Sequence, residues 1–255
     1  MNKIRLTLLI AFAILLINCN NSKDSISTLK MNYSFSIGKN AFEFDKSYPY
    51  AQGGNFKISF LAFYVSDIVL INDLGEEIHL PNSYRLFEND NFSQSLPSIP
   101  SGNYKEIRFS YGVPERVNTQ SGSEAIIATD YPQESPLNPA ANMYWGWANG
   151  YIFSKIEGRI DTDENGSFGD PGDVLFSYHP GNDALFRTVS YPISLQAKEN
   201  QESRIDVKID LLALISNCDF LTQPFAHPAS NSGTEFEAAK KLVDAWQESG
   251  SVTVY

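Results

Sequence analysis

The chain has few of the residues on which nucleophilic and metal-dependent enzymes rely. Among its 255 residues there are two cysteines and three histidines. The sequence contains no G-x-S-x-G nucleophile elbow, no G-x-x-x-x-G-K-[ST] phosphate loop and no H-E-x-x-H zinc motif. Acidic side chains are numerous but scattered, so the sequence indicates no glycosidase pair. We therefore predict a protein that is not an enzyme.

Positive charge and long apolar segments are also scarce. The chain has 19 Lys and Arg residues against 30 Asp and Glu residues, which gives a formal net charge of −11. An acidic surface repels the phosphates of nucleic acids and the headgroups of acidic lipids, whereas it is compatible with cations. After residue 19, no segment has the roughly 20 consecutive apolar residues that a membrane-spanning helix needs. Nucleic-acid binding is therefore excluded, and the sequence leaves the oligomeric state open.

The N-terminus holds the one long apolar run, and its order is that of a signal peptide. Lys3 and Arg5 precede the apolar residues 6–17, and Cys19 follows them. We predict a lipoprotein signal peptide over residues 1–18, a lipid anchor on Cys19 and a polar tether over residues 19–28. The alternative is ordinary secretion, in which Cys19 is discarded with the signal peptide. Lipidation favours a cell-envelope location, as an outer-membrane lipoprotein that faces the periplasm or the surface.

The remaining residues, 29–255, have the pattern of one β-sheet domain. Apolar and polar residues alternate in short segments separated by turn residues, which favours an all-β, antiparallel, immunoglobulin-like sandwich. One short helix is predicted near the C-terminus, at 234–248, where apolar residues follow a helical spacing. Residues 114–142 have little periodicity and predict a long functional loop that leads into an aromatic motif. Strands are predicted at 29–37, 56–69, 77–80, 104–113, 151–160, 174–178, 188–195, 204–212 and 251–255.

An acidic segment that begins at Asp161 resembles the start of a calcium-binding loop. Oxygen ligands at the first, third and fifth positions converge when a glycine lets the backbone turn sharply. The twelfth position of such a loop is usually a bidentate glutamate, but here it is Gly172, and two later aspartates are the available substitutes. The alternative is an acidic hairpin turn without a metal. The calcium candidates are Asp161, Asp163, Asn165, Asp170 and Asp173.

The histidines supply the candidates for a transition-metal site. His179 follows a predicted strand and precedes Pro-Gly, and His227 lies in a similar loop-like setting before the predicted helix. Imidazole and thioether groups suit copper in either oxidation state, so Met143 is a third candidate. The alternative is that each histidine is a hydrogen-bonded structural residue. His79 is expected on the solvent face of a strand, and Cys218 is expected to be a packed thiol or, less favoured, a soft ligand.

The densest motif of the chain is the aromatic stretch from residue 143 to residue 158. It holds Trp145 and Trp147 and leads into a strand with period-2 alternation. Three interpretations stay open for these aromatic residues: core packing at one end of the sandwich, a stacking platform for a sugar or another ring, and oxidative modification beside a metal.

The order of several motifs resembles the MbnP-like family of exported, copper-associated proteins. The matching parts are the segment F-x-x-F-Y-V-S-D-I from Phe60, the segment Y-x-x-I-x-F-x-x-G-V-P from Tyr104, the aromatic stretch with the Glu157-Gly158 pair, and His179 followed by Gly181. This resemblance implies a β-sandwich that binds copper through histidines, with His179 as the first candidate and His227 as the second. It also implies a tryptophan, Trp145 or Trp147, that a dihaem peroxidase-like partner oxidises to kynurenine.

Overall fold

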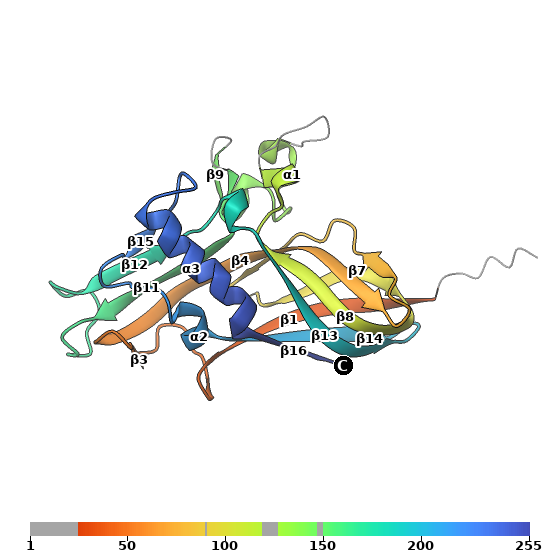
Figure 1. Cartoon of the computed structure of the whole chain (residues 1–255), viewed down its shortest axis with the longest axis horizontal. Coiled ribbons are helices and arrows are strands. Elements are labelled where there is room, and N and C mark those ends of the chain that lie inside the picture. The colour runs from red at the N-terminus through yellow and green to blue at the C-terminus, as the bar shows by residue number, and fades with distance from the viewer. Residues whose placement is uncertain (1–24, 90, 119–126, 147–149) are drawn as a thin grey trace, which may run out of the picture.

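Strands form about half of the structure, which is a computed structural model that describes residues 25–255 except 90, 119–126 and 147–149. Two sheets share the core, and a separate two-stranded hairpin, β9 (Tyr144–Gly146) with β10 (Gly150–Tyr151), lies above them beside α1 (Figure 1). The predicted all-β fold is confirmed. Within the described residues, no helix is long and apolar enough to cross a membrane.

The smaller sheet has the strand order β16-β14-β1-β2, with β7 also paired to β1. Its strands alternate buried and exposed residues, because successive side chains of a strand point to opposite faces and only one face packs on the core. Strands β1 and β14 are parallel neighbours. The bounds are β1 (Ile26–Ile37), β2 (Asn40–Ala41), β7 (Ser93–Pro100), β14 (Glu202–Asp210) and β16 (Gly250–Val254).

The larger sheet has the order β13-β8-β4-β11-β12-β15, and its longest strand, β4 (Asn55–Asn72), is the centre to which three short strands also pair. Most of its pairings are antiparallel, but β12 and β15 run parallel. The other bounds are β3 (Tyr48–Pro49), β5 (Glu77–His79), β6 (Arg85–Glu88), β8 (Gly102–Tyr111), β11 (Ser154–Asp161), β12 (Val174–Tyr178), β13 (Arg187–Ala197) and β15 (Phe225–Ala226).

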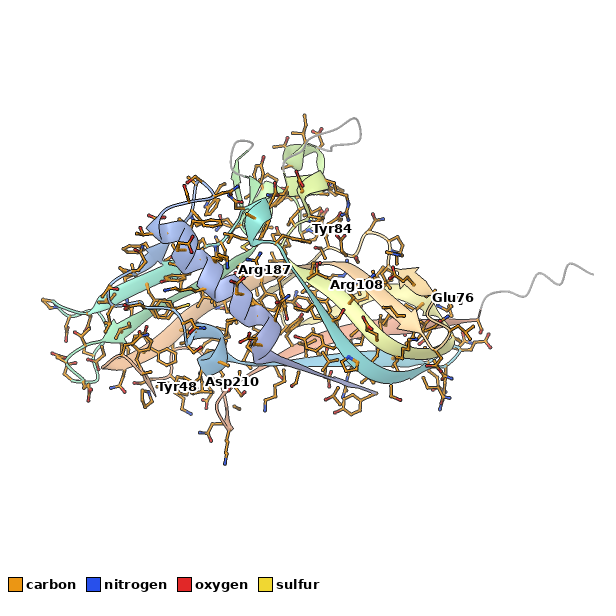
Figure 2. All side chains as sticks on the ribbon, viewed as in Figure 1. Tyr48, Glu76, Tyr84, Arg108, Arg187 and Asp210 are labelled. Carbon is orange, nitrogen blue, oxygen red and sulfur yellow. The ribbon has the colours of Figure 1, made fainter. Side chains whose placement is uncertain are left out.

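One long helix, α3 (Thr234–Ser249), crosses the sheets and closes the core (Figure 1). Its Trp246 is fully buried and stacks on Tyr111 of β8 at a ring-centroid distance of 4.5 Å. Arg187 of β13, labelled in Figure 2, makes an ion pair with Asp244 of the helix, with a nitrogen–oxygen distance of 2.7 Å. The shorter helical segments are α1 (Glu115–Asn118), η1 (Ala128–Asp130), η2 (Pro139–Ala141), η3 (Asp183–Leu185) and α2 (Leu211–Ile215).

The structure corrects the sequence-based expectations at several points. The sheets are mixed rather than purely antiparallel, because β1 pairs with β14 and β12 pairs with β15 in parallel. The first strand begins at Ile26 and Ser27 is buried, so the folded domain starts before residue 29 and takes in the end of the predicted tether. The strand predicted at 204–212 ends at Asp210, whose carboxylate accepts the Leu212 N–H at 3.0 Å and caps α2 (Figure 2). Cys19 and Trp147 lie outside the described residues.

Candidate metal centre at the edge of the larger sheet

The parallel pairing of β12 with β15 brings His179 and His227 together. Tyr178 is the register partner of Ala226, and each histidine is the next residue along its strand. The His179 N–H donates to the Ala226 carbonyl at 2.8 Å, which continues the ladder up to the two histidines. Neighbouring residues at the same level of adjacent strands place their side chains on the same face. The two imidazole rings accordingly stack, with centroids 4.2 Å apart and planes 10° from parallel.

Two polar side chains join the imidazoles from the same face of the sheet. Ser177 lies two residues before His179, so its hydroxyl points to the same side, and Oγ lies 3.0 Å from His179 Nε2 and 2.9 Å from His227 Nε2. Glu157 of β11 is the register partner of Ser177, and its Oε1 lies 2.7 Å from His179 Nε2. A chain of contacts therefore runs from Glu157 through His179 and Ser177 to His227.

A bulge and a glycine hold Glu157 in this position. The β11–β4 register shifts between Glu157 and Gly158, and such a bulge redirects the neighbouring side chains. A Cβ atom on Gly158 would lie 2.0 Å from the Lys57 carbonyl oxygen and 2.5 Å from the Phe176 ring, so only glycine fits there. The Glu-Gly pair of the sequence motif therefore has a structural reason, namely the close approach of β4 and β12 to β11.

The electrostatics of the cluster favour a neutral His227 beside an ionised Glu157. Burial and the neighbouring His179 lower the pKa of His227 below its usual 6.5. The hydrogen bond from His179 lowers the pKa of Glu157 below its usual 4.5. A neutral imidazole offers the lone pair that a metal ion needs, and a nearby carboxylate compensates the charge of a cation.

Trp145 covers one side of the pair. Its ring centroid lies 6.5 Å from that of His227, and the two planes are tilted by 49°. Gly181 packs closely against this ring and the hairpin backbone, since a Cβ atom on Gly181 would meet Trp145 Cζ3 at 3.1 Å and the Tyr151 carbonyl oxygen at 2.4 Å. The glycine two residues after His179 thus lets the hairpin of β9 and β10 approach the histidines.

The orientation of the rings limits what they can bind as they stand. The lone pair of an imidazole nitrogen lies in the plane of its ring, so two nearly parallel stacked rings do not aim at one point between them. One ring must rotate before both coordinate a single ion. Consistent with this, the structure does not bring ligand atoms of His179, His227 and Glu157, all described residues, within 4.8 Å of one another.

The acidic loop after β11 does form such a group. Ligand oxygens of Asp161, Asp163 and Asp173 all lie within 4.8 Å of one another. Asp161 is fully buried and accepts the N–H groups of Asn165 and Gly166 at 3.2 and 2.9 Å. The Asn165 amide nitrogen contacts the carboxylates of Asp163 and Asp170, both at 3.1 Å. All five calcium candidates therefore lie in one loop, three of them with converging oxygens.

The other predicted residues lie elsewhere. Met143 is buried in a second apolar cluster with Tyr64, Tyr151 and their neighbours, and its role as a ligand stays a prediction. His79 is exposed on β5 and contacts Glu77 at 3.2 Å, as expected for a solvent-facing strand residue. Cys218 is packed in the main core, where burial raises the pKa of its thiol to about 12. A thiol that resists ionisation is a poor metal ligand.

Sequence reasoning missed Ser177 as a member of the site, and treated Glu157 as part of a motif only. The signal for Ser177 was its position two residues before His179 on a strand, which puts both side chains on one face. Glu157 could be assigned to the site only from the register of β11 against β12, and that register depends on the geometry of the acidic loop between the two strands.

The chain is thus an all-β protein with one long helix, and two stacked imidazoles lie at the edge of its larger sheet. A family model named MbnP matches residues 26–232, and the chain is a member of the MbnP family, as its motifs predicted. The solved structure of MbnP from Methylosinus trichosporium is similar in fold, with a TM-score of 0.54 and 15% sequence identity over 89% of this chain and 98% of that one. No curated protein matches the chain.

Proposed function

We propose that the protein is a non-enzymatic, lipid-anchored envelope protein that binds copper, or a similar transition metal, through His179 and His227. The observation that carries this proposal is the 4.2 Å approach of the two imidazole rings, on segments far apart in the sequence. Membership in the MbnP family and the copper association that the motifs imply give the choice of metal. Neutral imidazoles are good ligands for copper in both oxidation states.

Other residues of the cluster support a metal in defined ways. Glu157 and Ser177 would contact Nε2 of the imidazoles, where they orient the rings and balance charge. Trp145 lies beside His227, so it is the favoured tryptophan for oxidation to kynurenine by a dihaem peroxidase-like partner. Intact mass and absorption spectra of protein purified from its own host test this part, because kynurenine changes the mass and absorbs to the red of tryptophan.

A copper titration against a competing chromophoric chelator tests the histidine pair. The variants are His179→Ala and His227→Ala, and the matched control is His79→Ala, which removes an exposed histidine of β5. Loss of a supporting group near a metal costs about 10- to 100-fold in affinity, so loss of a ligand is expected to cost at least about 100-fold, or roughly 2.7 kcal/mol. Equal affinity for the wild type and all three variants contradicts the site.

The acidic loop supports a second candidate function, a calcium-stabilised interaction module whose aromatic hairpin contacts a glycan or a partner protein. Three carboxylates with oxygens within 4.8 Å of one another repel unless a cation offsets their charge. Oxygen donors are the ligands that Ca²⁺ prefers. Calcium should therefore raise the melting temperature of the wild type, and Asp163→Ala should abolish the effect. The control Glu199→Ala, which removes an exposed carboxylate outside the acidic loop, should retain it. A melting curve that is the same in calcium and in EDTA rules this candidate out.

A further inference from the structure

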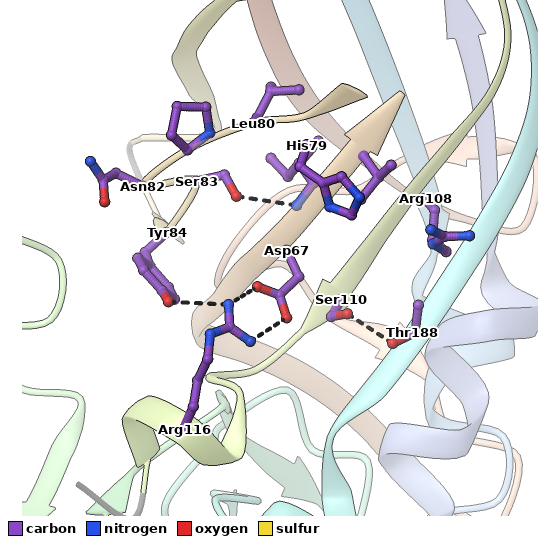
Figure 3. A pocket seen from close by; sticks show the side chains of 13 residues that line it. Asp67, His79, Leu80, Asn82, Ser83, Tyr84, Arg108, Ser110, Arg116 and Thr188 are labelled. Atoms are coloured by element: carbon purple, nitrogen blue, oxygen red, sulfur yellow. Dashed lines mark hydrogen bonds and ion pairs between the residues drawn. The ribbon is translucent and has the colours of Figure 1, made fainter. Parts of the chain in front are cut away.

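A separate pocket lies on another part of the larger sheet, between β5, the segment 80–84, β8, β13 and α1 (Figure 3). Its volume is about 690 Å³, which is within the range of small-molecule sites, about 300 to 1,000 Å³. None of its lining residues belongs to β11, β12 or β15, which carry the histidine cluster. The pocket is therefore independent of the proposed metal centre.

The charged side chains at this pocket are present as neutralised pairs. Arg116 of α1 makes a bidentate ion pair with Asp67 of β4, and Arg116 also contacts the Tyr84 hydroxyl at 3.4 Å (Figure 3). Arg108 of β8 binds Glu77 at 2.7 Å through one nitrogen. A guanidinium has five N–H donors, more than these contacts use. The pocket thus offers hydrogen-bond donors and acceptors without a surplus of either charge.

The backbone at Asp67 is held in an unusual conformation to make this arrangement. Asp67 has φ of +50°, in the left-handed region, and it lies at a bulge where the β4–β8 register shifts between Ser66 and Val69. A residue other than glycine in this region costs about 1 kcal/mol or more, and such residues cluster at ligand-binding sites. The bulge directs the Asp67 carboxylate to Arg116, on the wall of the pocket (Figure 3).

Hydroxyl groups and one aromatic ring complete the lining. Ser110 of β8 and Thr188 of β13 are register partners, and their hydroxyl oxygens lie 2.9 Å apart (Figure 3). Their contact uses one of two hydroxyl hydrogens, so the other is available to a ligand. Tyr84 adds a half-buried ring on the opposite side. An aromatic face next to several polar groups suits a ligand with C–H surfaces and many hydroxyls.

From these observations we infer that this pocket binds a neutral, hydroxyl-rich small molecule, a mono- or disaccharide, in contact with Tyr84, Arg116 and Thr188. An anion is disfavoured because both guanidiniums already have carboxylate partners and the whole chain has a net charge of −11. A neutral ligand exchanges hydrogen bonds with the Arg–Asp pair without separating the two charges, whereas an anion has to displace a carboxylate.

Saturation-transfer NMR on the exported, processed protein tests this inference. The probes are D-glucose, D-galactose, D-mannose, N-acetyl-D-glucosamine and cellobiose, with acetate and phosphate as anionic probes. We expect at least one sugar to receive saturation and neither anion to bind. Thr188→Val should reduce sugar affinity about 2- to 10-fold, which is the effect of one hydrogen bond. Tyr84→Ala should abolish the signal.

Two control variants locate the binding. Thr253→Val removes an exposed strand threonine outside the pocket, and Trp145→Ala removes the aromatic ring of the histidine cluster; both should leave sugar binding unchanged. Melting curves of every variant establish that it is folded. Absence of saturation for all five sugars overturns the inference, as does binding of acetate or phosphate at this pocket. Loss of the sugar signal in Trp145→Ala with retention in Thr188→Val and Tyr84→Ala also overturns it, because the sugar then binds at the aromatic hairpin.

Discussion

Gly181→Ala is the substitution whose effect the structure predicts most directly. The added Cβ atom would lie 2.4 Å from the Tyr151 carbonyl oxygen, 3.0 Å from Ile152 Cα and 3.1 Å from Trp145 Cζ3. A carbon normally stays about 3.3 Å or more from a carbonyl oxygen, so the backbone must retreat by about 1 Å. Two of the three atoms belong to backbone, which has less freedom to move than a side chain.

The cost follows from the packing at this point. Overpacking of a close-packed interior typically costs about 1 to 3 kcal/mol. For a protein of this size, each kcal/mol lowers the melting temperature by roughly 2 to 4 °C, so we expect a decrease of about 2 to 12 °C. Differential scanning calorimetry measures it. The matched control is Gly102→Ala, where an added Cβ atom meets nothing within 4 Å and little change is expected.

The same variant also tests the link between the aromatic hairpin and the histidines. Displacement of the hairpin by about 1 Å moves Trp145 relative to His227, and supporting groups near a metal change its affinity by about 10- to 100-fold. Copper affinity should therefore fall in Gly181→Ala and stay constant in Gly102→Ala. If both variants melt at the same temperature as the wild type, the packing argument is wrong. A lower melting temperature with unchanged copper affinity would show that Trp145 does not contribute to the site.

Two further predictions concern titratable groups. Because the pKa of His227 is lowered in the folded protein, the unfolded chain takes up that proton more readily, and stability should fall as the pH drops through 6.5. Glu157, whose pKa is lowered from 4.5, contributes stability above that value and loses it only at more acidic pH. Melting temperatures between pH 8 and pH 5 should therefore fall less in His227→Gln than in the wild type, and equal slopes contradict this assignment. The second prediction concerns the buried Cys218, whose pKa is about 12. In a Cys19→Ser protein produced without export, Cys218 should not react with a thiol reagent at pH 8 until the protein unfolds. Rapid reaction of the folded protein would refute the burial of this thiol.

Local patterns in the sequence were sufficient for most of the secondary structure. The helix predicted at 234–248 is α3 (Thr234–Ser249), and the strand predicted at 174–178 is β12. The strand β7 (Ser93–Pro100) was missed because it contains Pro97 and Pro100, which are rare in central strands. Among the described residues β7 pairs only with β1, and an edge strand tolerates residues that cannot donate to a ladder.

For this protein, the sequence by itself determined the signal-peptide pattern, the all-β class, the family and the residue types available to a metal. The tertiary structure decided which of those residues meet. His179 and His227 face each other because β12 and β15 run parallel and in register, and Glu157 joins them through the register of β11. Which strands pair across a large distance in the chain depends on the hydrogen bonds between them and on the packing of the whole core, and the alternation within one segment does not specify the partner. The orientation of the two rings likewise depends on Ser177 and on the hairpin that Gly181 admits.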